Sequence, residues 1–201
     1  MTEPEKPKHA RHESPVRRMF VESALIVFSL LLALAANSWN DSRKQRALAE
    51  HALAAIREEI TSNVDIVRSA RAYHDTMWKE TKRADSTKRV HSFAELVASA
   101  PAWSGFKAPI YDATAWQSAL TLGAVGGMGF DTVRTLSRLY AVQTRLDAYA
   151  SNIESFDFSD NAMPSTVRRM YVYFATVTTN EDTMLNRYTQ ALKLFGPQKK
   201  K

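Results

Sequence analysis

Cysteine is absent from this chain of 201 residues, and glycine and proline are scarce and unevenly placed. Without cysteine the chain has no disulfide, zinc–thiolate or iron–sulfur site and no cysteine nucleophile. Glycine and proline most penalise a helix interior. Both are missing from three long runs, residues 16–100, 130–163 and 165–195. These runs predict long helices, and the glycines and prolines gathered between residues 101 and 129 predict turns. Ser92 (followed by Glu95), Asp112 and Asp131 are expected to cap helices.

Charge of one sign is also not concentrated in long blocks. Lysine and arginine exceed aspartate and glutamate by six, and the two signs alternate along most of the chain. Apolar residues make up 45% and charged residues 24%, as in an ordinary globular protein. The mild basic excess is therefore typical of a solvated helical surface, and no nucleic acid is expected as a partner. The last three lysines are interpreted as part of a solvated basic tail, residues 198–201.

One long apolar run lies near the N-terminus. Every residue from Ala24 to Ala36 is apolar except Ser29. With its flanks the run approaches the ~20 residues that a helix needs to cross a bilayer. Trp39 follows it, and an indole prefers the headgroup layer. We therefore predict a transmembrane helix at residues 19–40.

Two other interpretations of residues 19–40 remain open. A basic pair, Arg17 and Arg18, precedes the apolar run, and small residues follow it, as in a cleaved signal peptide. A buried core helix is the third interpretation, although such helices are seldom apolar on every face. Glu22 would interrupt the apolar region of a signal peptide. A retained anchor therefore agrees best with the sequence.

The segment before the anchor, residues 1–18, contains three prolines and is expected to be a disordered tail. Within roughly 20 residues of the anchor, five lysines and arginines precede it and four follow it. The short tail is positive, so its transfer across a membrane would be unfavourable. We expect the N-terminus in the cytoplasm and the large domain outside it, which in a bacterial host means an anchor in the inner membrane and a domain in the periplasm.

Residues 41–197 are predicted to form an all-α domain. The transmembrane helix continues into a long helix, where Ile56, Ile60 and Val64 repeat at the spacing of one helix face. On the two later long helices the same spacing predicts inward-facing side chains, among them Leu136, Leu139, Met184 and Tyr188. About three long and one or two short helices are expected to pack as an antiparallel bundle. Residues 171–179 are rich in β-branched and aromatic residues and could favour a strand. The apolar spacing of three and four continues on both sides, so a helix is predicted there. The long helix could also pair with its twin in a second copy.

Known catalytic and binding motifs are missing. The glycines at 123–129 match no phosphate-binding loop, and neither a strand nor a lysine accompanies them. His51 and His74 lie 23 residues apart on one predicted helix, too far to share a metal, and no HExxH or ExxH pair occurs. No GxSxG motif is present. No cofactor, metal ligand or catalytic residue is predicted.

Polar residues on the predicted helix faces are the remaining candidates. Glu59 and Asn63 are four residues apart and share one face. Beside Ile56 and Ile60 they form either a hydrogen-bonded pair that fixes helix register or a polar patch that binds a ligand or partner. An envelope enzyme with a site near residues 101–129 would be supported by a concave pocket that joins Glu59 to Trp116, Tyr140 and Gln143.

The chain resembles a family of uncharacterised bacterial proteins over roughly residues 20–150. Four patterns carry the resemblance: Asn37-Ser-Trp39, Glu59-x-x-x-Asn63, Ala115-Trp116-x-x-Ala119-x-x-x-Gly123 and Leu136-x-x-Leu139-Tyr140-x-x-Gln143. Members of the family have an N-terminal transmembrane helix and a helical domain of unknown function. The resemblance implies an envelope protein and supplies no catalytic residue.

Two functions follow as hypotheses. The first is a membrane-anchored helical interaction, sensory or scaffold module without catalysis, whose partners are the lipid bilayer and another protein or a second copy. The alternative is an envelope enzyme with a site near the aromatic segment 101–129.

Overall fold

The computed structural model describes residues 15–196, and every regular element among them is helical. The predictions for residues 1–14 and 198–201 lie outside this range. The elements in chain order are α1 (Pro15–Thr87), α2 (Phe93–Ser99), α3 (Thr114–Thr121), η1 (Ala124–Gly127), α4 (Phe130–Ala150), η2 (Ser151–Ser155), η3 (Asp160–Ala162), α5 (Met163–Leu192) and η4 (Lys193–Phe195). The η elements are short 3₁₀ helices. The prediction of an all-α chain is confirmed for the described residues.

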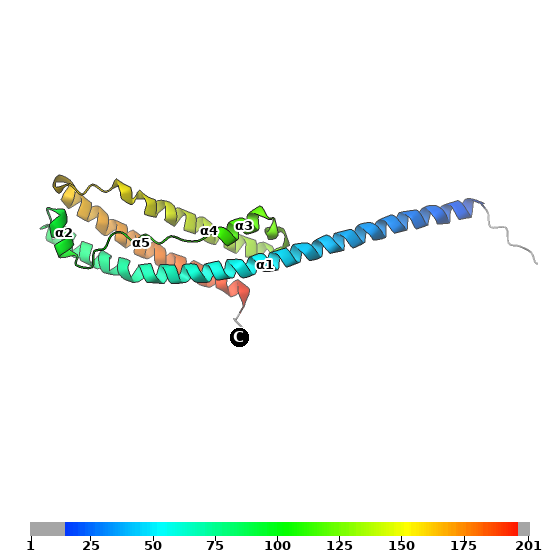
Figure 1. Cartoon of the computed structure of the whole chain (residues 1–201), viewed down its shortest axis with the longest axis horizontal. Helices are drawn as coiled ribbons and strands as arrows, with labels where there is room; N and C mark the ends of the chain where they lie inside the picture. The colour runs from blue at the N-terminus through cyan, green and yellow to red at the C-terminus, as the bar shows by residue number, and fades with distance from the viewer. Residues whose placement is uncertain (1–14, 197–201) are drawn as a thin grey trace, which may run out of the picture. The chain divides into compact units, whose positions relative to one another are not determined.

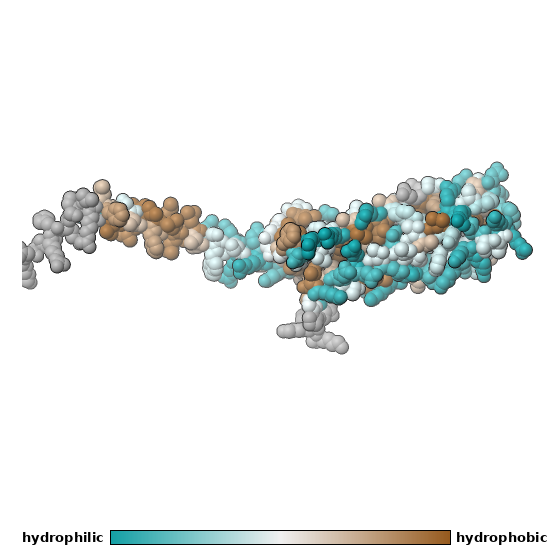
Figure 2. All heavy atoms as spheres, turned by 180° about the vertical axis from the view of Figure 1, so that it is seen from behind, coloured by the Kyte–Doolittle hydropathy of each residue, from teal (hydrophilic) through white to brown (hydrophobic). Residues whose placement is uncertain are grey.

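The chain divides into two compact units, residues 1–45 and 46–201. In the first unit, the apolar side chains of α1 are exposed, and Phe28 and Leu32 keep more than half of their surface. Figure 2 shows this part of α1 as a continuous hydrophobic surface. Among the described residues, α1 is the one helix long and apolar enough to cross a membrane. Ser29 donates to the carbonyl of Leu25 at 2.8 Å, so its hydroxyl is satisfied within the helix.

The second unit contains α2 to α5 and the rest of α1 (Figure 1). One core cluster joins α1, α3, α4 and α5. Its largest fully buried side chains are Ile56, Ile60, Leu136, Leu139, Met184 and Tyr188. Burial of an aliphatic side chain of this size contributes about 1.5–3 kcal/mol. The apolar spacing in the sequence placed each of these residues on the inward face of its helix, which the structure confirms.

A second core cluster surrounds the connecting segment, residues 100–113, which joins α2 to α3. It includes Met77 of α1, Leu96 of α2 and Phe174 of α5. Phe106 lies in the irregular connecting segment, and its ring stacks on Phe174 with centroids 5.9 Å apart and meets Tyr173 edge-on at 5.3 Å. Figure 1 shows the segment running alongside the helices of the second unit. Aromatic packing therefore holds a stretch of chain that forms no regular structure.

Most helix ends lie near the turn and capping residues predicted from the sequence, and some caps differ in the exact residue. Ser92 caps α2 by accepting from the Glu95 N–H at 3.2 Å, as predicted. Gly123 adopts φ +69° after α3, a conformation that glycine adopts without strain. Asp131 was expected to cap α4, but Gly129 occupies that position and Asp131 pairs with Arg134 in the first turn. A carboxylate there still stabilises the positive end of the helix.

Three further boundaries differ from the predictions. Asp112 was expected to cap α3, but Ala113 occupies the cap, and Asp112 accepts from the Thr114 N–H at 2.9 Å. Pro164 lies inside the first turn of α5, where its missing N–H costs no hydrogen bond. Likewise α1 begins at Pro15, within the predicted tail. Residues 171–179 are helical, so the prediction of a helix over a strand is confirmed.

Candidate functional site

Five polar and aromatic residues predicted from the sequence come together in the second unit; they are called the Glu59 cluster, and its members are Glu59, Asn63, Trp116, Tyr140 and Gln143. Glu59 of α1 is buried, with 7% of its surface exposed. Its Oε2 accepts from the Ala115 N–H at 2.6 Å. Its Oε1 accepts from the Tyr140 hydroxyl at 2.5 Å and the Trp116 N–H at 3.4 Å. Both oxygens are therefore occupied by donors from α3 and α4.

Asn63, one turn further along α1, holds the residue that precedes α3. Its amide nitrogen donates to the carbonyl of Asp112 at 2.7 Å, and its amide oxygen accepts from the Asp112 N–H at 2.9 Å. Gln143 of α4 donates to the same carbonyl at 3.0 Å and accepts from the Tyr188 hydroxyl at 2.9 Å. The amides of Asn63 and Gln143 thus connect α1, α4 and α5 at the backbone of Asp112.

The Glu59 cluster binds backbone groups at and just before the N-terminus of α3. A carboxylate at the N-terminus of α3 receives N–H groups that have no partner within the helix. The ring of Trp116 stacks on Tyr140 in nearly parallel planes, with centroids 5.3 Å apart. Because the polar atoms bond to one another, the arrangement agrees with the register hypothesis. A hollow beside α3 is lined instead by Asp112, Thr114, Gln117 and their neighbours, and no member of the cluster lines it.

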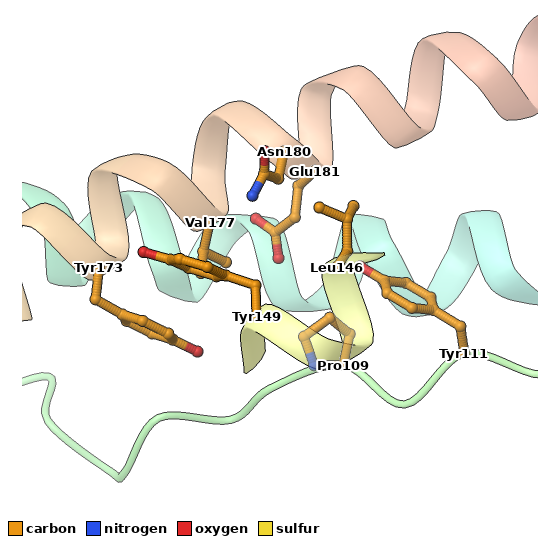
Figure 3. Close-up of a pocket in the computed structure, with 8 residues that line it drawn as sticks. All are labelled: Pro109, Tyr111, Leu146, Tyr149, Tyr173, Val177, Asn180 and Glu181. Carbon is orange, nitrogen blue, oxygen red and sulfur yellow. The ribbon is translucent and has the colours of Figure 1, made fainter. Parts of the chain in front are cut away.

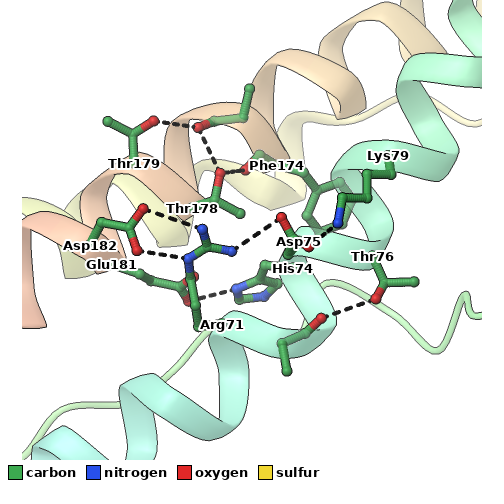
Figure 4. Close-up of polar contacts among 12 residues, drawn as sticks. Arg71, His74, Asp75, Thr76, Lys79, Phe174, Thr178, Thr179, Glu181 and Asp182 are labelled. Carbon is green, nitrogen blue, oxygen red and sulfur yellow. Dashed lines mark hydrogen bonds and ion pairs between the residues drawn. The ribbon is translucent and has the colours of Figure 1, made fainter.

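A second buried polar group was not predicted. His74 of α1 and Glu181 of α5 are almost fully buried and lie 107 residues apart in sequence, with Nδ1 2.6 Å from Oε1 (Figure 4). The other ring nitrogen of His74 lies 2.9 Å from the carbonyl oxygen of Phe106. A carbonyl only accepts, so His74 Nε2 carries a hydrogen and donates it. The pair therefore ties α1 and α5 to the connecting segment.

Charged residues surround this pair at the protein surface. Arg71 donates to both oxygens of Asp182, at 2.9 and 3.2 Å, and approaches Asp75 at 3.4 Å. Lys79 bonds to Asp75 at 2.5 Å (Figure 4). The hydrogen bond from Lys79 holds the pKa of Asp75 below its ordinary value. The Arg71–Asp182 pair joins α1 to α5, whereas the two pairs with Asp75 lie within α1, and surface ion pairs contribute at most about 1 kcal/mol each.

Next to the His74–Glu181 pair lies a small cavity of about 20 Å³, called here the tyrosine cavity. Its lining comes from the connecting segment, α4 and α5, and comprises Pro109, Tyr111, Leu146, Tyr149, Tyr173, Val177, Asn180 and Glu181 (Figure 3). Two buried polar atoms here, Oε2 of Glu181 and the hydroxyl of Tyr173, have no hydrogen-bond partner among the described residues. Buried polar atoms of this kind are uncommon and call for a physical explanation.

The His74–Glu181 pair is indicated in the sequence by an ionisable residue within the apolar stripe of each helix. His74 follows the apolar stripe of α1 after Val67 and before Met77, and Glu181 lies between Val177 and Met184 on α5. An ionisable residue inside an apolar stripe is rarely buried without a partner. One such residue in each of two neighbouring helices therefore indicates a buried pair.

Comparisons with known proteins give no match for this chain, whether with family models, curated proteins or solved structures. The resemblance described above therefore stays a prediction. Within residues 15–196, no group of three or more histidine or carboxylate side chains could hold a metal ion.

The buried tyrosines predict a response to alkali. Burial is the main cause that raises the pKa of Tyr111, Tyr140, Tyr173 and Tyr188 above the ordinary value of 10. Unfolded tyrosines release their protons near pH 10, so the folded state is fully stable below that pH and loses stability as the pH rises above it. We expect these phenols to ionise only together with unfolding, measured by tyrosinate absorbance and circular dichroism. Ionisation of all seven tyrosines near pH 10 with helix retained would contradict this.

Proposed function

We propose that this chain is a single-pass membrane protein of the bacterial envelope whose helical domain serves as an interaction, sensory or scaffold module. The observation that carries the proposal is the apolar stretch of α1 from Ala24 to Ala36, whose large side chains are all exposed. An uninterrupted apolar helical surface of this length is stable in a bilayer and unfavourable in water. The lipid bilayer is accordingly the first partner.

The helical domain in this proposal is an antiparallel bundle of α1, α4 and α5. Direct contacts between α4 and α5, and the core residues that α1 shares with both, support the bundle. Because apolar faces of all three helices are buried within one chain, self-pairing is not needed to cover them. A protein partner would then bind the outer surface of the domain.

The hydrogen bonds of the Glu59 cluster support the proposal that the domain has no catalytic role. A general base needs an oxygen within hydrogen-bond reach of a substrate proton. Both oxygens of Glu59 instead accept from groups of the chain itself. Replacement of Glu59 would therefore alter the position of α3, and no free oxygen of Glu59 is left to act as a general base.

The enzyme hypothesis keeps one supporting observation, the convergence of Glu59, Tyr140 and Gln143 beside the segment 101–129. It requires turnover that is lost when a single polar residue is replaced while the fold is kept. A substrate screen on the purified chain, followed by Gln143→Leu, tests this. Turnover that Gln143→Leu removes without a change in helix content would overturn the non-catalytic proposal.

Membrane topology is the decisive experiment for the proposed function. A periplasm-active phosphatase and a cytoplasm-active fluorescent protein are fused separately to the C-terminus, and each is assayed in washed membranes. We expect phosphatase activity in the membrane fraction and no fluorescence, because the short positive tail stays in the cytoplasm.

Two controls separate the alternatives for residues 19–40. Leu30→Arg with Leu31→Arg should release the fusion from membranes, because arginine at the centre of a bilayer costs about 2.5–3.5 kcal/mol per residue. Phosphatase activity in the soluble periplasm with a shortened chain would indicate a cleaved signal peptide. Fluorescence of the second fusion would place the helical domain in the cytoplasm and contradict the orientation.

A further inference from the structure

We propose that the tyrosine cavity is a binding site for the primary ammonium group of a small amine, with Glu181 as the acceptor at its base. The site belongs to the helical domain, goes beyond the proposed function and does not depend on the membrane anchor. Its three kinds of support are an acceptor without a donor, local negative charge and walls of aromatic rings.

The acceptor is Oε2 of Glu181. His74 Nε2 donates to the Phe106 carbonyl, and a single proton occupies the 2.6 Å contact between His74 Nδ1 and Glu181 Oε1. Wherever that proton lies, it is on the Oε1 side of the carboxyl, so Oε2 has no hydrogen and can only accept. Glu181 is 99% buried, and Oε2 has no donor among the described residues. A ligand for this atom must therefore be a hydrogen-bond donor or a metal ion, and the described residues hold no group of three or more histidine or carboxylate side chains that could bind a metal.

The charge around the cavity selects a cation. Asp147 of α4 is half-buried, and its carboxylate has no hydrogen bond or ion pair within the described part of the chain. Its charge reaches Tyr111, because Glu181 and Asp147 both add to the effect of burial in raising the pKa of that phenol. The lining of the cavity contains no lysine or arginine. Because the His74–Glu181 pair shares its proton and is neutral overall, the negative charge near Tyr111 comes from Asp147.

The aromatic walls and the small volume of the tyrosine cavity restrict the class of ligand further. Tyr149 stacks on Tyr173 with centroids 5.8 Å apart, and Tyr111 lies across from them with its hydroxyl toward Glu181 (Figure 3). The faces of aromatic rings attract cations. A volume of about 20 Å³ accommodates one group the size of a water molecule. A primary ammonium group fits this space, whereas a quaternary ammonium group does not.

The test is a titration of the full-length protein in detergent micelles with ¹³C-methylammonium chloride, observed by NMR. Bound methyl groups lie close to the tyrosine rings, so we expect a saturable upfield shift of the methyl signal. Potassium chloride at equal ionic strength should not reproduce or displace the effect, because K⁺ donates no hydrogen bond. Tetramethylammonium should not compete, because of its size.

Three variants assign the shift to the cavity. Glu181→Gln should weaken binding by about tenfold or more, because an NH₂ group, which cannot accept a hydrogen bond, replaces one of the two carboxyl oxygens. Asp147→Asn lies at a partly exposed position and should weaken it several-fold with the fold retained. Asp182→Asn is the matched control; it removes a neighbouring carboxylate that pairs with Arg71 outside the cavity, and binding should be unchanged.

Each result of the methylammonium titration either supports or overturns the proposed site. A shift that does not saturate, or that Asp147→Asn and Asp182→Asn affect equally, overturns the proposal even if Glu181→Gln fails to fold. Equal displacement by potassium would show a general cation site and overturn the requirement for a hydrogen-bond donor. Saturable binding that Asp147→Asn weakens several-fold and Asp182→Asn leaves unchanged supports the site, whatever the topology fusions show.

Discussion

Replacing Glu59 by alanine should lower the free energy of unfolding of the helical domain by about 3–5 kcal/mol. The substitution leaves two backbone N–H groups at the start of α3 and the hydroxyl of Tyr140 without an acceptor. Each buried donor without a partner costs about 1–3 kcal/mol. The lost side chain also leaves a cavity in a packed region, which adds to the cost.

The measurement is urea unfolding of the full-length protein in micelles, followed by tryptophan fluorescence, since Trp116 stacks on Tyr140 inside the same cluster. Glu58→Ala is the matched control, because Glu58 is the adjacent residue, carries the same side chain and is exposed. It should change the unfolding free energy by less than about 0.5 kcal/mol. Equal effects of the two substitutions would show that Glu59 does not hold α3.

Glu59→Gln separates shape from charge at the same position. Glutamine keeps the volume, but its amide nitrogen is a donor and would face either an N–H group of α3 or the Tyr140 hydroxyl. An intermediate loss of about 1–3 kcal/mol is therefore expected. If the amide were tolerated without loss, the carboxylate charge would not be needed by the fold and would be free for another role.

The helices were predictable because their signals are local. Glycine and proline are missing from the long runs, and the apolar residues keep a spacing of three and four, so α1, α4 and α5 follow from the sequence. The exact ends did not follow as well. Gly129 and Asp131 both suit the start of a helix, and only the backbone geometry decides between them. Neighbouring polar residues give equivalent local signals at such positions.

The Glu59 cluster was predicted as a set of residues but not as a network. The spacing of Glu59 and Asn63 placed them on one face, yet nothing in the sequence showed that Asn63 binds both the N–H and the carbonyl of Asp112. Asp112 takes part through its backbone, and a backbone contact leaves no residue type to recognise. Tyr188 was predicted to be inward, but its bond to Gln143 depends on how α4 and α5 are rotated.

Replacing His74 by leucine should destabilise the domain by about 3–5 kcal/mol, because it leaves the carboxyl group of Glu181 buried without its hydrogen-bond partner. The Phe106 carbonyl loses its donor as well, so the connecting segment should loosen. His51→Leu is the control, since His51 is an exposed histidine on the same helix. Urea unfolding measures the loss, and amide hydrogen exchange at residues 104–110 reports the segment.

The double replacement His74→Leu with Glu181→Leu tests whether the pair or the apolar environment matters more. Removing both members leaves no buried ionisable group, and buried pairs exchanged for apolar residues are often neutral or stabilising. We therefore expect the double variant to be more stable than His74→Leu alone, a coupling that additive effects cannot produce. Additive losses would mean that each residue acts through separate contacts. A stable double variant that no longer binds methylammonium would show that Glu181 is dispensable for the fold and is required for the ligand.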